Sequence, residues 1–144
     1  MNSYNKGNCA KNAWHTFTNN FVASINGTQT LVFSYTAIGN GAVLYFTNVQ
    51  VYDASNTQLL SNGDFSSSSG TTPTNWLECS SSGQVSSACS VNVAVACYTN
   101  SVQGGSISQS FPVTFGTSYT VAFDLYHFSP TGNSGSMTFD IAVA

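Results

Sequence analysis

The chain has 144 residues, of which only 5% are charged, and its formal net charge is −3. Soluble domains average about 25% charged residues, so solubility here must depend on hydroxyl and amide groups, which 23 Ser, 16 Thr and 15 Asn supply. Two Lys+Arg are too few for nucleic-acid binding, which depends on cations set against phosphates. No apolar run is long enough to span a membrane, and the length fits one domain with its own core.

The N-terminal stretch "NSYNKGNC" has no apolar run, so we expect no signal peptide. Four cysteines and a hydroxyl-rich surface are typical of an oxidising, extracellular setting. We therefore expect an extracellular protein and interpret the chain as a mature or excised form.

Period-2 alternation of apolar residues predicts strands along the chain, and no helical stripe of useful length occurs. The clearest strands are "TLVFSY" (30–35), "VLYFTNVQVY" (43–52), "TVAFDLY" (120–126) and "MTFDIAV" (137–143). Stretches such as "GNG", "SSSSGTTPTN" and "SPTGNSG" are typical of loops. The pattern predicts an all-β chain of two packed antiparallel sheets.

Two parts of the sequence are also similar to each other. Residues 16–35, "TFTNNFVASINGTQTLVFSY", align without a gap on 106–125, "SISQSFPVTFGTSYTVAFDL". After a loop of different length, "GAVLYFTNVQV" aligns with "GSMTFDIAVA". Strands can resemble one another by chance, but the shared spacing favours a repeat of strand, turn, long core strand, loop and returning strand.

Five stretches carry a resemblance to a known family. "LLSNGDF" (59–65), Trp76 in "TNW" and "GGSISQSFPVTFGTSYTVAFDLYHF" (104–128) are similar to the first part of a carbohydrate-binding module of families 4 and 9. "WHTFTNNFVASINGTQTLVFSY" and "AVLYFTNVQVYD" are similar to that module's last part. The resemblance implies a jelly-roll β-sandwich of the galactose-binding-like type.

The two parts of the module stand in rotated order. Residues 1–58 supply the closing strands and residues 59–144 the opening strands of one structural unit. Either one chain closes on itself as a circular permutant, or residues 1–58 of one chain complete 59–144 of the next in a head-to-tail filament. A frame-shifted unit of a tandem repeat would have the same sequence, and the sequence does not choose among the three.

The cysteines are Cys9, Cys79, Cys89 and Cys97, which allow three pairings. Cys89 and Cys97 flank the short β-prone run "SVNVAVA", so we predict a local disulfide there and a second one between Cys9 and Cys79. Zinc is a poor alternative because no CxxC occurs and the two histidines are far away in the sequence.

Candidate glycan-binding residues combine aromatic and acidic side chains, because rings stack on sugar faces and carboxylates orient hydroxyls. Asp124, Tyr126 and Asp140 occupy outward-facing positions on strands that we expect to be neighbours. Trp14 and Tyr98 are candidates for the walls of the same glycan site. The competing interpretation for the tryptophans and Tyr98 is core or rim packing. We expect no enzyme activity: no nucleophile motif surrounds a serine, and the family resembled is non-catalytic.

Two further sites follow from the resemblance and from a motif. Modules of this family often hold a structural calcium ion, for which Asp53 and Asp64 are the candidate ligands, with backbone carbonyls as the rest. No other cofactor is expected. Asn26 begins the sequon Asn26-Gly27-Thr28, but Asn-Gly also favours a hairpin turn.

Two functions therefore compete. The first is a non-catalytic structural subunit or repeat of an extracellular fibre, coat or adhesive that assembles head-to-tail; low charge, disulfides and the rotated boundaries favour it. The alternative is a glycan-binding module of a larger secreted enzyme or adhesin, which the resemblance favours, although a fold does not fix a function.

Overall fold

The computed structural model describes residues 2–5, 12–38, 43–79, 83–87, 89, 96–100, 104–128 and 136–144. Within these residues the chain forms twelve β-strands and no helix, as the alternation predicts. Accordingly, no helix in this part of the chain is long and apolar enough to cross a membrane.

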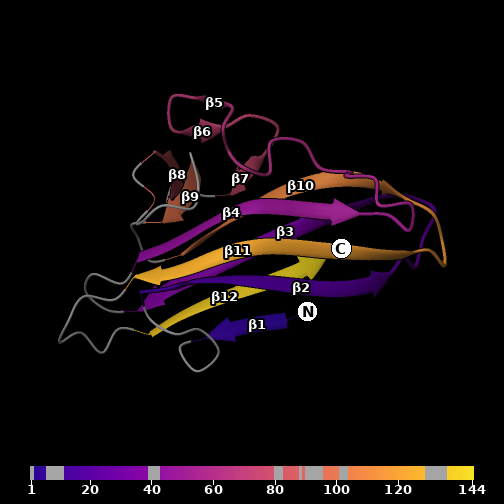
Figure 1. The fold of residues 1–144 in the computed structure, drawn as a ribbon, viewed down its shortest axis with the longest axis horizontal. Helices are drawn as coiled ribbons and strands as arrows, with labels where there is room; N and C mark the ends of the chain where they lie inside the picture. The colour runs from indigo at the N-terminus through magenta and orange to yellow at the C-terminus, as the bar shows by residue number, and fades with distance from the viewer. Residues whose placement is uncertain are drawn as a thin grey trace.

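Two antiparallel five-stranded sheets pack face to face (Figure 1). The first sheet contains, in spatial order, β1 (Asn2–Asn5), β12 (Ser136–Val143), β3 (Gly27–Ile38), β10 (Gly105–Val113) and β7 (Leu77–Cys79). The second contains β2 (Trp14–Val22), β11 (Ser118–Phe128), β4 (Val43–Tyr52), β9 (Cys97–Asn100) and β8 (Gly83–Ser86). β5 (Ser68–Ser69) and β6 (Thr72–Pro73) form a separate two-stranded sheet.

The strand order is that of a jelly roll. If β5 to β8 are set aside, eight strands remain: β1 to β4 and β9 to β12. Counted along the chain, one sheet has the order first (β1), eighth (β12), third (β3) and sixth (β10). The other sheet has the order second (β2), seventh (β11), fourth (β4) and fifth (β9). The fold predicted from the alternation and the family resemblance is confirmed.

The core lies between the sheets and is rich in aromatic rings. Phe33 on β3 and Phe123 on β11 face each other from opposite sheets, with ring centroids 5.3 Å apart. On β4 the inward positions change parity, because Phe46 and then Val49 are both fully buried. Asn48 lies between them at φ 52°, where the pairing of β4 with β11 shifts register. This bulge moves the inward positions of β4 from Leu44 and Phe46 to Val49 and Val51.

The internal sequence similarity corresponds to a structural repeat. β2, β3 and β4 match β10, β11 and β12, and the pairings match as well: Phe17 pairs with Phe123, while their counterparts Ile107 and Phe33 also pair. Equivalent side-chain hydrogen bonds recur. The Thr120 hydroxyl donates to Asn20 Oδ1 over 2.8 Å, and the hydroxyls of their counterparts Thr30 and Ser110 lie 2.9 Å apart. The sandwich therefore has approximate two-fold symmetry.

The two segments of the chain interleave in both sheets. β11, from residues 59–144, lies between β2 and β4, and β3, from residues 1–58, lies between β10 and β12. β1 also pairs with β12, which brings the two ends of the chain together (Figure 1). Residues 1–58 and 59–144 therefore complete one sandwich within a single chain.

The "LLSNGDF" stretch forms a turn and no strand. Asn62 and Phe65 have positive φ values of 52° and 55°, so the chain turns there. The backbone of Gly63 approaches Val49 so closely that a Cβ atom would collide with the Val49 carbonyl. Asn62 Nδ2 donates to the carbonyls of Ser67 (2.6 Å) and Thr74 (2.9 Å). A short polar side chain here organises the turn.

The predicted disulfide between Cys89 and Cys97 is confirmed, with Cα atoms 5.8 Å apart. Cys79, at the end of β7, is exposed and forms no disulfide with any residue that the structure describes. Cys9 lies outside the described residues, so its pairing with Cys79 stays a prediction. The two strands nearest these residues in the chain, β1 and β7, are at opposite edges of the first sheet.

Candidate functional site

A row of three aromatic side chains crosses the outer face of the second sheet. Tyr126 on β11 pairs with Trp14 on β2 and with Tyr45 on β4. The ring centroids of Trp14 and Tyr126 lie 5.4 Å apart, and those of Tyr45 and Tyr126 lie 6.0 Å apart. Side chains of directly paired residues project from the same face of a sheet, so strand register alone assembles this aromatic row.

The three rings differ in exposure. Tyr126 is only 5% exposed, whereas Trp14 and Tyr45 on either side are half-buried. The planes of the outer rings are inclined to the Tyr126 ring by 48° and 63°. Tyr126 is therefore the packing support of the row, and Trp14 and Tyr45 present the surface that a ligand would meet.

Asp124 lies beside the aromatic row, two residues before Tyr126 and on the same face of β11. Its Oδ1 accepts a 2.6 Å hydrogen bond from the Thr16 hydroxyl, and its Oδ2 accepts a 2.7 Å bond from Asn48 Nδ2. The β-bulge places Asn48 there. Asp124 thus fixes the Thr16 hydroxyl and the Asn48 amide next to the rings. Asp124 and Asn48 are half-buried, and Thr16 is exposed.

Tyr98 does not belong to this surface, which corrects the prediction that it is a wall residue for a glycan. It is fully buried on β9, where its side chain projects between the sheets. Its hydroxyl donates to Glu78 Oε1 over 2.7 Å and lies 3.4 Å from the Tyr35 hydroxyl. Burial first, and then these hydrogen bonds, raise the pKa of Tyr98 far above its usual range, so the phenol stays protonated.

Asp140 is also separate from the site. It lies on β12 in the first sheet, between the inward-facing Phe139 and Ile141, so it projects from the outer face opposite to that of Asp124. The prediction that Asp124 and Asp140 share one sheet face is therefore wrong. Their parity along each strand was read correctly, but the two strands belong to different sheets.

The candidate calcium ligands each stabilise a local turn. Asp53 Oδ1 accepts the backbone N–H groups of Ser55 (2.9 Å) and Thr57 (2.8 Å). Asp64 Oδ1 accepts the N–H (3.2 Å) and the hydroxyl (2.9 Å) of Ser66. The two carboxylates line different pockets. The described residues contain no group of three or more His, Cys, Asp or Glu side chains that could hold a metal ion.

Asn26 is exposed in the turn between β2 and β3. Because β2 and β3 belong to different sheets, this turn crosses between the sheets and is not the hairpin turn that Asn-Gly suggests. Gly27 follows at φ 127°, a conformation that favours glycine. The side-chain oxygen of Asn26 accepts the Phe115 N–H over 2.8 Å. Glycosylation of Asn26 stays a prediction.

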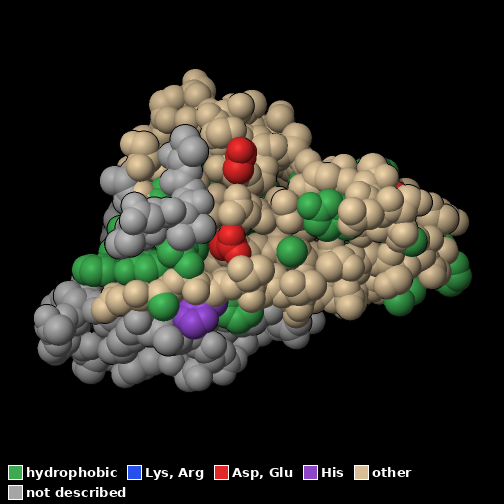
Figure 2. Space-filling model, viewed as in Figure 1, with side chains coloured by type: hydrophobic (Ala, Val, Ile, Leu, Met, Phe, Trp, Pro, Cys, Tyr) green, Lys and Arg blue, Asp and Glu red, His purple; other side chains and the backbone are tan. Residues whose placement is uncertain are grey.

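The chain is poor in charge, with only 5% charged residues. On the face shown in Figure 2, the tan of backbone and uncharged polar side chains predominates, and only a few acidic side chains are visible. The sequence predicted Trp14, Asp124 and Tyr126 of this site and missed Thr16, Tyr45 and Asn48. Tyr45 has the outward parity of β4, but only the pairing of β4 with β11 shows which outward residues become neighbours.

Comparison with known proteins identifies no relative of this chain: no protein-family model matches it, and neither curated proteins nor solved structures give a significant match.

Proposed function

We propose that the chain is a non-catalytic, extracellular module that binds neutral glycans on the outer face of the second sheet. The observation that carries this proposal is the aromatic row beside the hydrogen-bonded group of Asp124, Thr16 and Asn48. Pyranose rings have apolar C–H faces and polar edges, so a site needs both ring surfaces and oriented hydrogen-bonding groups. The resemblance to carbohydrate-binding modules points the same way.

The charge balance favours a neutral ligand. The chain has only two Lys+Arg, and recognition of sulfated or carboxylated glycans depends on such cations. Asp124 would repel an anionic sugar at the site itself. The disulfide and the hydroxyl-rich surface support an extracellular location.

A second candidate is the structural subunit of a fibre or coat that assembles head-to-tail. It is favoured by β2, a nine-residue strand at the edge of the second sheet with no described strand on its outer side. Unpaired strand edges are templates for pairing with another chain. Because one chain completes its own sandwich, assembly would join whole sandwiches through such edges and need not exchange halves.

The glycan proposal is tested by titrating neutral oligosaccharides, such as glucan, xylan and galactan fragments, into the wild type and the variants Trp14→Ala and Tyr45→Ala. We expect each substitution to weaken binding of the preferred fragment by about tenfold, in line with the energy of one stacking contact. Phe115→Ala is the matched control, because Phe115 is 66% exposed but lies in the turn after β10.

Equal losses in all three variants, or no binding of any neutral fragment, would refute the proposal. Electron microscopy of the same sample addresses the second candidate. Long particles that disappear when a proline replaces Thr18 in β2 would support assembly through the β2 edge, since proline removes a backbone donor.

A further inference from the structure

The internal repeat creates two equivalent grooves between the sheets, and the described residues fill only one of them. One lies between β4 and β10 and is occupied by the chain's own segment 58–63; we call it the filled groove. The other lies between β12 and β2 and contains a pocket of about 220 Å³; we call it the open groove. Every residue that lines the open groove has a counterpart on the filled side.

The filled groove shows how such a site holds an extended peptide. The Leu59 N–H donates to the Val51 carbonyl over 2.8 Å, so the segment runs along the edge of β4. Gln109 on β10 holds Ser61 from the other side: its Oε1 accepts the Ser61 N–H (2.7 Å) and its Nε2 donates to the Ser61 carbonyl (3.0 Å). Leu60 between them is buried.

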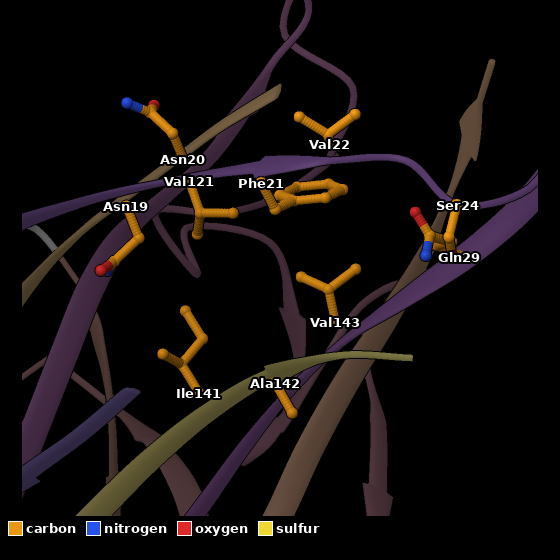
Figure 3. A pocket seen from close by; sticks show the side chains of 10 residues that line it. All are labelled: Asn19, Asn20, Phe21, Val22, Ser24, Gln29, Val121, Ile141, Ala142 and Val143. Atoms are coloured by element: carbon orange, nitrogen blue, oxygen red, sulfur yellow. The ribbon is translucent and has the colours of Figure 1, made fainter. Parts of the chain in front are cut away.

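The open groove has the same walls without the segment. Phe21, Ile141 and Val143 correspond to Phe111, Val49 and Val51 of the filled groove, as the register of the repeat requires. Figure 3 shows Phe21, Val121, Ile141 and Val143 around the open space, with Gln29 and Ser24 at one end. Every described residue that lines this groove is uncharged.

A buried acceptor in the open groove has no partner. Gln29 on β3 is 7% exposed, and its Oε1 has no hydrogen bond. An unsatisfied buried oxygen is costly and uncommon in folded proteins. The counterpart of Gln29 in the repeat is Tyr119, whose hydroxyl accepts the Thr114 N–H over 2.9 Å. The equivalent acceptor on the filled side is therefore satisfied, whereas Gln29 Oε1 lacks a donor.

One edge of the open groove is also free. β1 pairs with β12 only as far as Asn2 with Ile141. Beyond that point, no strand or loop among the described residues pairs with the outer side of Val143. Its counterpart Val51 uses both backbone groups, donating to Gln58 Oε1 (2.8 Å) and accepting from Leu59 N–H.

We propose that the open groove binds an extended, uncharged peptide segment with an aliphatic side chain, held as segment 58–63 is held in the filled groove. The aliphatic side chain packs among Phe21, Ile141 and Val143. A backbone or side-chain N–H of the peptide donates to Gln29 Oε1. The volume is below the range of about 300–1,000 Å³ that is usual for drug-sized ligands, which favours one side chain over a larger molecule. This site is separate from the aromatic row and does not depend on the glycan proposal.

The test uses the full chain and a capped synthetic peptide of residues 56–62, NTQLLSN. We expect saturable amide and methyl NMR shifts at Phe21, Gln29 and Val143. A control peptide with serine in place of both leucines should bind at least tenfold more weakly. Val143→Asp, which puts a charge into the groove, should weaken the NTQLLSN complex at least tenfold. Leu77→Asp is the matched control, because Leu77 is 72% exposed on β7 at the far edge of the first sheet.

Gln29→Leu is a second variant that tests the hydrogen bond in case Val143→Asp unfolds the sandwich. It should raise the melting temperature, because it removes the unsatisfied oxygen, and weaken peptide binding about fivefold. The proposal is overturned if the serine peptide binds equally well, if the shifts are confined to Val51 and Gln109 in the filled groove, or if monosaccharides shift the open groove and the peptide does not.

Discussion

The two long central strands, β3 and β11, are counterparts in the repeat and differ in an instructive way. Their inward residues are alike and all buried: Leu31, Phe33 and Tyr35 on β3 against Val121, Phe123 and Leu125 on β11. Their outward residues are not alike: Val32, Ser34 and Thr36 on β3 against Ala122, Asp124 and Tyr126 on β11. The packing surface is repeated, whereas the outer surface is not.

This difference separates what builds the fold from what serves a function. An inward position must fill a close-packed space between the sheets, so both copies need side chains of similar size. An outward position has no such requirement, and the two copies are free to differ. Of these two strands, only β11 carries aromatic and acidic side chains on its outward face, which is the reason to place the candidate site on the second sheet.

The largest loss of stability is expected at core positions where the two copies of the repeat have the same residue. Phe33→Ala and Phe123→Ala should each lower the free energy of unfolding by about 3–5 kcal/mol, because both rings are fully buried in the core. The two rings touch across the sheets, so the double variant should cost less than the two single losses combined. Urea denaturation measures all three values.

Phe115→Ala is the control and should change the free energy of unfolding by less than about 0.5 kcal/mol, because Phe115 is largely exposed. If either core variant were as mild as this control, the two central strands would not carry equivalent parts of the core.

The repeated part of the molecule is also what the sequence predicts well. The period-2 pattern of Phe33 and Phe123 identifies both central strands, and the spacing between Cys89 and Cys97 identifies the local disulfide. These features depend on neighbours in the sequence or on one face of one strand. Local pattern is sufficient for them.

The candidate site depends on which strands become neighbours, and this is why its prediction is only partly right. Asp124 and Asp140 have the same outward parity, yet jelly-roll topology puts them on opposite faces. The alternation in "VNVAVACY" puts Tyr98 on the parity opposite to the valines, yet Cys97 and Tyr98 are both fully buried. Asn48 could not be identified, since its position depends on a β-bulge that appears only when β4 and β11 pair.

A smaller effect is expected where the inward residues differ in polarity. Tyr35 on β3 lies against Tyr98, whereas its counterpart Leu125 has no hydroxyl. Because folding raises the pKa of Tyr98, the unfolded chain loses the phenol proton first as the pH rises past its usual value. The contribution of Tyr98 to the free energy of unfolding should therefore be constant below about pH 10. Above that pH it should fall by up to about 1.4 kcal/mol per pH unit.

Tyr98→Phe is the variant that identifies the group. It should cost about 1–2 kcal/mol at neutral pH, because the hydrogen bond to Glu78 is lost, and it should flatten the decline above pH 10. Urea denaturation at pH 8, 9.5 and 10.5 measures both effects. An unchanged alkaline slope in Tyr98→Phe would assign the decline to another group.

The smallest effect on stability, and the most informative one, is expected from giving β11 one outward residue of β3. Asp124→Ser introduces the side chain of its counterpart Ser34. Asp124→Ser removes two hydrogen bonds from half-buried and exposed groups, so we expect a loss of less than about 1 kcal/mol. Glycan affinity should nevertheless fall by about tenfold, because Thr16 and Asn48 lose the carboxylate that orients them. The reciprocal variant Ser34→Asp, on the opposite face, is the control and should leave glycan binding unchanged. If Ser34→Asp weakened binding as much as Asp124→Ser did, the site would not lie on the second sheet.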